Sequence, residues 1–153
     1  MRQILSVYPA KYDTMFKAVL ALPLAIMAYS GIEMARTNPD ATWALAGTCA
    51  FVAILFWLIM PRKFLITDNS LKFILGASLS FNVTFAKIRE ARALKGVGFG
   101  INFATSFKEP VEIIRTKGLN INFSPQDRYK FLKDFDLALQ NWRKNTSSYD
   151  QSH

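Results

Sequence analysis

Apolar residues are unevenly distributed along this 153-residue chain. Residues 41–60, ATWALAGTCAFVAILFWLIM, contain no charged residue. As a helix they would be about 30 Å long, close to the thickness of the hydrocarbon core of a bilayer. A second apolar run covers residues 15–35 and carries Lys17 near its start and Glu33 near its end. Charges near the ends of a span cost less than charges at its centre, so the pattern predicts two transmembrane helices, over residues 15–35 and 41–60.

The segment that joins the two runs is short and polar. Residues 36–40, RTNPD, contain an Asn-Pro-Asp sequence, which favours a turn. A cleaved signal peptide is the alternative interpretation of the first run. That run is long, however, and a second run of full length follows almost at once. We therefore predict a transmembrane helical hairpin over residues 15–60.

Basic residues flank both outer ends of the predicted hairpin. They are Arg2, Lys11 and Lys17 on one side and Arg62 and Lys63 on the other, whereas the connecting loop has Arg36 opposed by Asp40. The positive-inside rule then places the N-terminal segment, residues 1–14, and the chain after residue 60 on the cytoplasmic side of the membrane. Lys17, Arg62 and Lys63 are the candidate basic anchors at the membrane interface.

The pattern changes at Pro61 from continuous apolar residues to short alternating runs. RKFLIT and LKFILG flank a polar turn at residues 68–70, and VEIIRTK and LNINF meet at residues 117–118, so both pairs are typical of β-hairpins. SFNVTFAKI and INFATSF also alternate. We predict six or seven strands of a small antiparallel sheet that curls on itself.

A helical pattern follows the last predicted strand. Ser124 is placed to cap a helix, and Pro125 suits its first position. Apolar residues then recur at helical spacing: Phe131, Leu132, Phe135, Leu139 and Trp142. We predict a capping helix over residues 125–142 and a flexible polar tail over residues 145–153.

These segments together resemble the small bacterial membrane proteins that carry a pleckstrin-homology-like (PH-like) domain behind a two-helix hairpin. The matching stretches are PRKFLITDNSLKFILG, VTFAKIREARAL and GLNINFSPQDRYKFLKDFDLAL. The resemblance implies a membrane-anchored α+β protein whose cytoplasmic domain, residues 61–144, is a split β-barrel of about seven antiparallel strands with one C-terminal capping helix. Members that bind phosphoinositides carry a Lys-x-Arg-type cluster near the first hairpin. Here that turn is Asp68-Asn69-Ser70, which argues against such recognition.

The stretch KGVGFG, residues 95–100, looks like a phosphate-binding loop but lacks the required spacing. A dinucleotide fingerprint needs G-x-G-x-x-G followed by a helix. Here the third glycine comes one position early, and an alternating strand pattern follows. We expect a pliable loop or an irregular strand edge, with Phe99 as an exposed aromatic residue.

A band of basic residues precedes this loop: Lys87, Arg89, Arg92 and Lys95. Three interpretations remain open for the band together with Phe99. The first is a solvated strand edge, the second a surface for anionic head groups, and the third a surface for an acidic partner protein. In an extended segment, Lys87 and Arg89 would share one face, with Ala91 beside them.

No constellation of catalytic or metal-binding residues is evident in the sequence. The only histidine, His153, is the last residue, and the only cysteine, Cys49, lies inside the second apolar run. Acid–base catalysis needs carboxylates that converge in a pocket, and the acidic residues are scattered. We expect no enzyme activity, no cofactor, no metal and no small-molecule substrate.

Net charge supports association with a membrane rather than with nucleic acid. Residues 61–153 contain 15 Lys and Arg against 8 Asp and Glu, a net charge of +7. The basic residues form no single helix face and no nucleic-acid-binding motif. The leading hypothesis is a non-catalytic accessory subunit or assembly factor of a membrane protein complex. The alternative is a protein that binds or handles anionic lipids.

Overall fold

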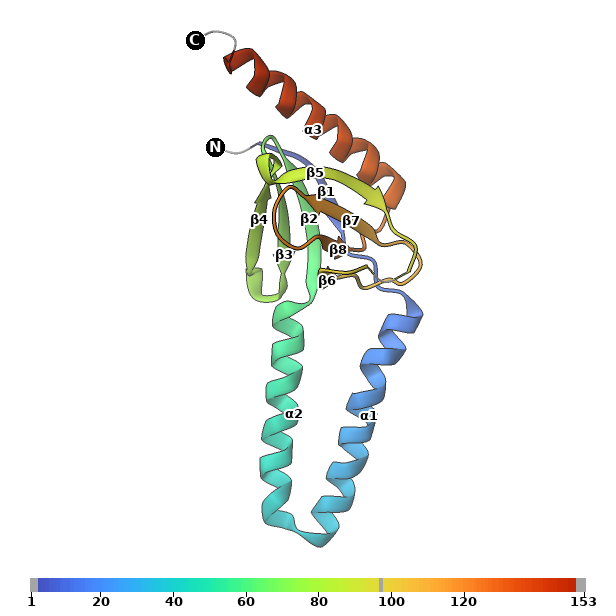
Figure 1. Cartoon of the computed structure of the whole chain (residues 1–153). Helices are drawn as coiled ribbons and strands as arrows, with labels where there is room; N and C mark the ends of the chain where they lie inside the picture. The colour runs from blue at the N-terminus through green and yellow to red at the C-terminus, as the bar shows by residue number, and fades with distance from the viewer. Residues whose placement is uncertain (1–2, 97, 151–153) are drawn as a thin grey trace.

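The computed structural model describes residues 3–96 and 98–150. The elements in chain order are β1 (Ile4–Pro9), α1 (Thr14–Thr37), α2 (Pro39–Ile59), β2 (Pro61–Thr67), β3 (Ser70–Leu75), the short 3₁₀ helix η1 (Gly76–Ser78), β4 (Ser80–Thr84), the short 3₁₀ helix η2 (Phe85–Lys87), β5 (Ile88–Ala93), β6 (Ile101–Phe103), β7 (Val111–Arg115), β8 (Ile121–Phe123) and α3 (Arg128–Asp150). Figure 1 shows α1 and α2 as a hairpin that projects from one end of a β-domain, with α3 at the opposite end.

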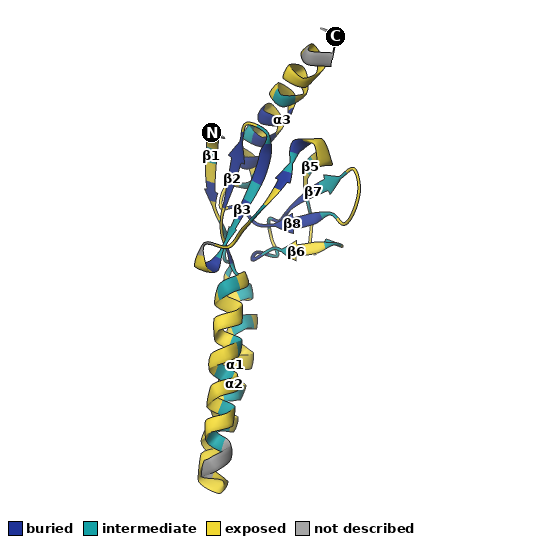
Figure 2. Ribbon diagram, turned by 90° about the vertical axis from the view of Figure 1, so that its left-hand side faces the viewer, coloured by how far each residue is buried: buried dark blue, intermediate teal, exposed yellow. Residues whose placement is uncertain are grey.

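The helices α1 and α2 correspond to the two apolar runs. Among the described residues, they are the helices long and apolar enough to cross a membrane. No part of either apolar window is buried by the rest of the chain, and Figure 2 shows the hairpin largely exposed along its length. These helices are therefore not the core of the β-domain. Their bounds lie within a few residues of the predicted ones.

The strand β1 is a part of the domain that the sequence analysis did not assign to it. It pairs antiparallel with β2, with Tyr8 opposite Phe64 and Ser6 opposite Ile66. The predicted division into an N-terminal segment 1–14 and a domain beginning at residue 61 therefore separates two strands that are hydrogen-bonded. The chain leaves the sheet after β1, forms the α1–α2 hairpin and returns to the same sheet at β2.

Within residues 3–96 and 98–150 the strands form two four-stranded sheets, in the orders β1-β2-β3-β4 and β5-β7-β8-β6. The predicted hairpins β2–β3 and β7–β8 are both confirmed. The prediction of a purely antiparallel arrangement is wrong, because β6 pairs parallel with β8. The predicted strand through residue 107 also ends early, at Phe103. The sheets do not close into one barrel.

The core lies between the two sheets and is rich in aromatic residues. Phe73 stacks on Phe81 with ring centroids 4.5 Å apart, and Phe123 contacts Phe64 at 4.5 Å. Each fully buried phenylalanine contributes about 1.5–3 kcal/mol relative to an exposed one. The side chains of the domain thus fill its own interior.

The helix α3 closes one end of this core with the predicted apolar stripe. Its buried members are Phe131, Phe135 and Leu139, and its partly buried members are Leu132 and Trp142. The start of the helix differs from the prediction. Asp127, not Ser124, caps it, since Asp127 Oδ1 accepts a hydrogen bond of 3.0 Å from the Lys130 amide. Ser124 is buried and bonds instead to the backbone of Ser106.

The C-terminal end of α3 also differs from the predicted bounds. The helix continues to Asp150, so most of the tail expected to be flexible is helical. Arg143, Lys144 and the residues up to Ser148 are exposed, so the last turns extend beyond the sheet (Figure 1). Residues 151–153, and with them His153, lie outside the described residues.

Candidate functional site

The hairpin joins the domain at a neck, which we define as residues 10–13, 60–63 and 104–109. Asp13 is its central residue. Its Oδ1 accepts a hydrogen bond of 2.7 Å from the Phe16 amide and so caps α1, while its Oδ2 accepts one of 2.7 Å from the Phe107 amide. These bonds, led by the one from Phe16, hold the pKa of Asp13 below its usual value. One carboxylate thus ties the first turn of α1 to the domain.

Further hydrogen bonds at the neck join segments that are distant in sequence. The Tyr12 hydroxyl donates to the Pro61 carbonyl, which links the start of α1 to the end of α2. Lys11 forms a hydrogen-bonded ion pair with Glu109, and this pair lowers the pKa of Glu109. Burial raises the pKa of Tyr12. Both ends of the hairpin are therefore fixed to the domain and to each other.

The last turn of α2 packs against η1. A Cβ added to Gly76 would lie 1.7 Å from the Trp57 carbonyl oxygen, so only glycine permits this approach. The Arg62 guanidinium, at the start of β2, lies over the ring of Trp57 from this turn, 5.2 Å from the ring centroid. Of the predicted basic anchors, Arg62 and Lys63 follow α2 directly and Lys17 lies in the first turn of α1. All three are exposed at the hairpin–domain junction.

The basic band is divided between different environments. Lys87 and Arg89 are exposed at the start of β5, and the Arg89 carbonyl accepts a hydrogen bond of 2.7 Å from Arg143 of α3. A β-bulge between Ile88 and Glu90 interrupts the alternation of side chains between the two faces of β5. Ala91 consequently packs against the core instead of sharing a face with Lys87 and Arg89.

Arg92, unlike Lys87, forms an ion pair within the domain. Its guanidinium lies 2.8 Å from Glu112, whose side chain is only 5% exposed. The Asn120 side chain donates to the other carboxylate oxygen of Glu112 at 2.9 Å. Because Glu112 would be costly to bury alone, Arg92 has a structural role as its counterion. Among the described residues, Lys87, Arg89 and Lys95 are exposed and form no ion pair. The cationic surface of β5 is therefore centred on Lys87 and Arg89, with Arg143 added from α3 and Lys95 in the loop that follows.

This surface lies at the end of the domain opposite the hairpin. In the order β5-β7-β8-β6, β6 is nearest the hairpin and β5 is farthest from it (Figure 1). Neighbouring strands are about 4.8 Å apart, so three steps separate β5 from β6 by about 14 Å. The Debye length at physiological ionic strength is about 8 Å. Charges on β5 would thus be screened from a membrane surface at the neck.

The glycine-rich stretch forms the loop from β5 to β6. A Cβ at Gly98 would lie 2.6 Å from Asn122 Oδ1, and Gly100 has a φ of 132°. Glycine at these positions allows the loop to lie close over β8. Phe99, between them, is 89% exposed. The loop is thus a glycine-dependent connection that presents one aromatic side chain to solvent.

A row of polar residues beneath this loop was missed by sequence reasoning. Glu112 of β7 lies opposite Asn122 of β8, which lies opposite Asn102 of β6. Asn122 is fully buried, and its amide has no hydrogen-bond partner among the described residues. The alternation in LNINF marks Asn122 as facing away from the core. Only the strand pairing brings it next to Glu112.

Several carboxylates of the domain are used in structural contacts. Asp134 accepts a hydrogen bond from the buried Tyr8 hydroxyl, and burial together with this bond raises the pKa of Tyr8. Asp136 bonds to Gln140 within α3. Residues 3–96 and 98–150 contain no cluster of three His, Cys, Asp or Glu side chains that could hold a metal ion.

The geometry therefore offers two places for recognition: the basic surface of β5 with the loop after it that exposes Phe99, and the neck with the apolar hairpin. Comparisons of the chain with protein-family models, with curated proteins and with solved structures found no match.

Proposed function

We propose that this chain is a non-catalytic membrane protein whose hairpin spans the bilayer twice and holds the β-domain at the cytoplasmic face. The domain is an interaction platform, and the chain is an accessory subunit or assembly factor of a membrane protein complex. The relationship to PH-like domains of bacterial inner-membrane proteins belongs to the same proposal. The observation that carries it is the exposed pair Lys87 and Arg89 at the start of β5, the strand of its sheet that lies farthest from the hairpin (Figure 1). Phe99 is exposed in the loop that follows β5.

The pairing of β1 with β2 supports a hairpin that crosses twice. These strands precede α1 and follow α2, and they share one sheet. Both flanks of the hairpin must then lie on the same side of the membrane, and the basic flanks favour the cytoplasmic side. Cleavage of α1 as a signal peptide would remove β1 and expose the edge of β2. The sheet thus favours an uncleaved chain.

The partner that fits the basic end of the domain is an acidic protein segment. Arg89 and Arg143 are adjacent there, and a carboxylate-rich segment would complement both. Exposed aromatic residues such as Phe99 are frequent anchors of protein interfaces. The alternative function, binding of anionic lipid by the domain, is favoured by the net charge of +7 over residues 61–153. It would have to use the neck, since β5 is about two Debye lengths away.

A photo-cross-linking experiment in native membranes tests this proposal. The photoreactive residue p-benzoylphenylalanine replaces Phe99 in the full chain, because a fragment that begins at residue 61 would lack β1. We expect a discrete protein adduct that disappears in Lys87→Glu/Arg89→Glu. The matched control is Lys130→Glu/Lys133→Glu, which makes the same charge change on an exposed part of α3. Adducts to lipid alone, or equal loss in both double variants, would refute the partner surface.

A further inference from the structure

The two helices of the hairpin are close together at its tip and separate toward the domain (Figure 1). Near the tip, a Cβ on Gly31 would lie 3.5 Å from Leu45 Cδ2, which is an ordinary packing distance. In the half next to the domain, the separation leaves a cavity of about 530 Å³ between the helices. A smaller cavity of about 290 Å³, which shares Met27, continues between the helices toward the tip.

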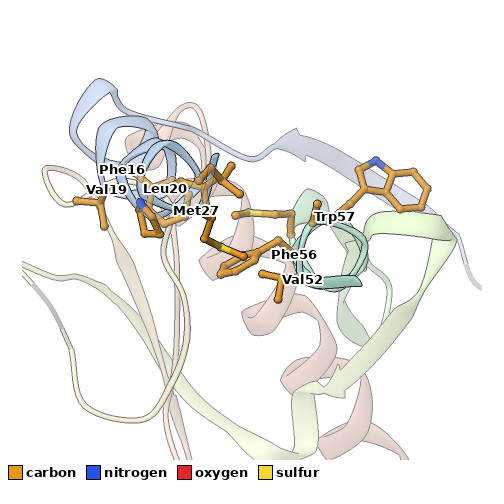
Figure 3. A pocket seen from close by; sticks show the side chains of 11 residues that line it. Phe16, Val19, Leu20, Met27, Val52, Phe56 and Trp57 are labelled. Atoms are coloured by element: carbon orange, nitrogen blue, oxygen red, sulfur yellow. The ribbon is translucent and has the colours of Figure 1, made fainter. Parts of the chain in front are cut away.

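Apolar side chains line this cavity from both helices. Phe16, Leu20 and Met27 of α1 face Val52 and Phe56 of α2, whereas the Trp57 ring points away from α1 (Figure 3). Apart from the Trp57 indole, whose ring points away from α1 (Figure 3), no side chain in this lining carries a strong hydrogen-bond donor or acceptor. In a bilayer, a cavity of this kind is filled by hydrocarbon, either of lipid or of protein.

The size of the cavity selects between these two occupants. Three turns of a helix about 10 Å wide occupy about 1,300 Å³. That is more than twice the volume between α1 and α2. A transmembrane helix from a partner or from a second copy could lie across the mouth of the groove, but it could not enter the groove without forcing the hairpin open, because the neck fixes the domain ends of both helices. An unbranched hydrocarbon chain is much narrower and fits.

The end of the cavity next to the domain meets polar groups. An adjoining cavity of about 210 Å³ shares Phe16, Phe56 and Met60 and adds Asn102 and Thr105 at the base of the domain. Asn102 is exposed, and its Oδ1 accepts a bond from the Ala104 amide, which leaves Nδ2 as a donor. The hydrocarbon groove thus opens onto groups that can donate to a head group.

The charges of the neck favour an anion, although Arg62 and Lys63 line a separate hollow with Trp57 and not the groove itself. In the described part of the chain, Lys17, Arg62 and Lys63 form no ion pair. The nearby acids are already engaged, Asp13 by two backbone amides and Glu109 by Lys11. The uncompensated charge at the neck is therefore positive, which complements the phosphate of a lipid head group.

We propose that this groove is a binding site for one acyl chain of a membrane phospholipid, with the phosphate at the neck and the chain end near Met27. The inference rests on the proposed transmembrane hairpin and goes beyond it. A lipid held in this way fills the space between α1 and α2 and supports their separation beneath the domain. It also gives the basic neck a ligand that differs from the partner of β5.

The test uses the full chain in nanodiscs of phosphatidylethanolamine and phosphatidylglycerol. A phosphatidylglycerol with a diazirine near the end of one acyl chain is the first probe, and one with the diazirine near the head group is the second. We expect the first probe to label the peptides around Met27 and Val52, and the second to label those around Phe16 and Met60. Reversed depths, or equal labelling of the outward residues Leu22 and Ile54, would overturn the proposal.

Two variants separate specific binding from general contact with lipid. Ala53 lines the groove and Ala50 is exposed outside its lining, so Ala53→Trp fills the groove and Ala50→Trp adds the same bulk elsewhere. Ala53→Trp should reduce labelling at Met27 about tenfold, as the loss of about two buried methylene groups would. Ala50→Trp should leave it unchanged, and equal effects would refute the site.

Three further outcomes separate failure of the lipid site from failure of the membrane hairpin. Chain-to-chain cross-links at Val52 in place of lipid labelling would identify a second copy as the occupant and overturn the proposal. Release of the full chain from native membranes by alkaline carbonate would refute the hairpin itself and the lipid site with it. A chain that resists carbonate while its groove stays unlabelled overturns the lipid site alone.

Discussion

Replacing Asp13 with alanine should loosen the junction between α1 and the β-domain. The Asp13 carboxylate accepts one hydrogen bond from the first turn of α1 and another from the loop before β7, both 2.7 Å long. Alanine removes both acceptors, and the Phe16 and Phe107 amides lose their partners. The expected effect is a local opening at the neck with the two sheets still folded.

The magnitude follows from these two bonds. Loss of an N-cap costs about 1 kcal/mol. A hydrogen bond to a charged acceptor contributes about 1.5–3 kcal/mol, and the lower value applies because Asp13 is only half-buried. Since the contributions of neighbouring bonds are not additive, we expect a total of about 2 kcal/mol. This corresponds to about a 30-fold increase in the population of the open neck.

Hydrogen exchange followed by mass spectrometry on the full chain in nanodiscs measures this opening. Peptides that cover residues 14–17 and 105–107 should exchange about 30-fold faster in Asp13→Ala, whereas β3 should be unaffected. Asp136→Ala is the control, because it removes an exposed carboxylate from α3. Unchanged exchange at residues 105–107 would show that Asp13 does not hold the neck.

The pH dependence provides a second readout of the same carboxylate. The pKa of Asp13 is lowered in the folded chain, so the unfolded chain binds more protons at acidic pH. Its stabilising contribution is present above the ordinary value of 3.8 and is lost as the pH falls through the folded value. The protection of residues 105–107, expressed relative to the intrinsic exchange rate at each pH, should therefore fall below pH 3.8 in the native chain and not in Asp13→Ala. A parallel response of both chains would refute this assignment.

Three further substitutions test other parts of the structure. Gly76→Ala should lower the melting temperature of the full chain by several degrees, because its Cβ would collide with the Trp57 carbonyl. The control Gly47→Ala, whose Cβ would meet nothing within 4 Å, should not lower it, and equal melting temperatures would contradict the packing of η1 on α2. Asn122→Leu should raise the free energy of unfolding by about 1 kcal/mol by removing a buried amide without a partner among the described residues, and a loss of stability would mean that the amide has a ligand. Because the pKa of Tyr8 is raised in the folded chain, the free energy of unfolding should fall as the pH rises above 10. Tyr8→Phe should weaken this fall in an alkaline denaturation series, and identical profiles of the two chains would contradict the role of Tyr8.

The sequence was sufficient for elements defined by strong local periodicity. The two apolar runs, the turns at residues 68–70 and 117–118, and the stripe of α3 all depend on residues that are close in the chain. Features that depend on pairing between distant segments could not be predicted. The strand β1 is only six residues long and has one buried side chain, Tyr8, so its alternation is weak. Its role becomes visible only when β2 lies beside it.

The candidate site shows the same limit. The residues Lys87, Arg89, Arg92 and Lys95 look equivalent in sequence. The bulge at residues 88–90 and the register of β5 on β7 give them different roles, because they place Arg92 opposite Glu112. A register cannot be derived from one strand alone, since the partner strand lies about 20 residues away and several alignments satisfy the same apolar pattern. The sequence could therefore indicate a basic segment without showing which charges remain free.

The insertion of the hairpin between β1 and β2 connects the two proposed sites. Because both ends of the hairpin are fixed at the neck, the orientation of the domain relative to the hairpin depends on Asp13, Tyr12 and Gly76. In the proposed membrane topology, that orientation places β5 away from the bilayer and the basic neck beside it. A partner at β5 and a lipid at the neck would then bind one rigid unit without competing for the same charges. Loosening the neck should therefore weaken the Phe99 adduct even though Asp13 touches neither ligand, whereas filling the groove with Ala53→Trp should spare that adduct.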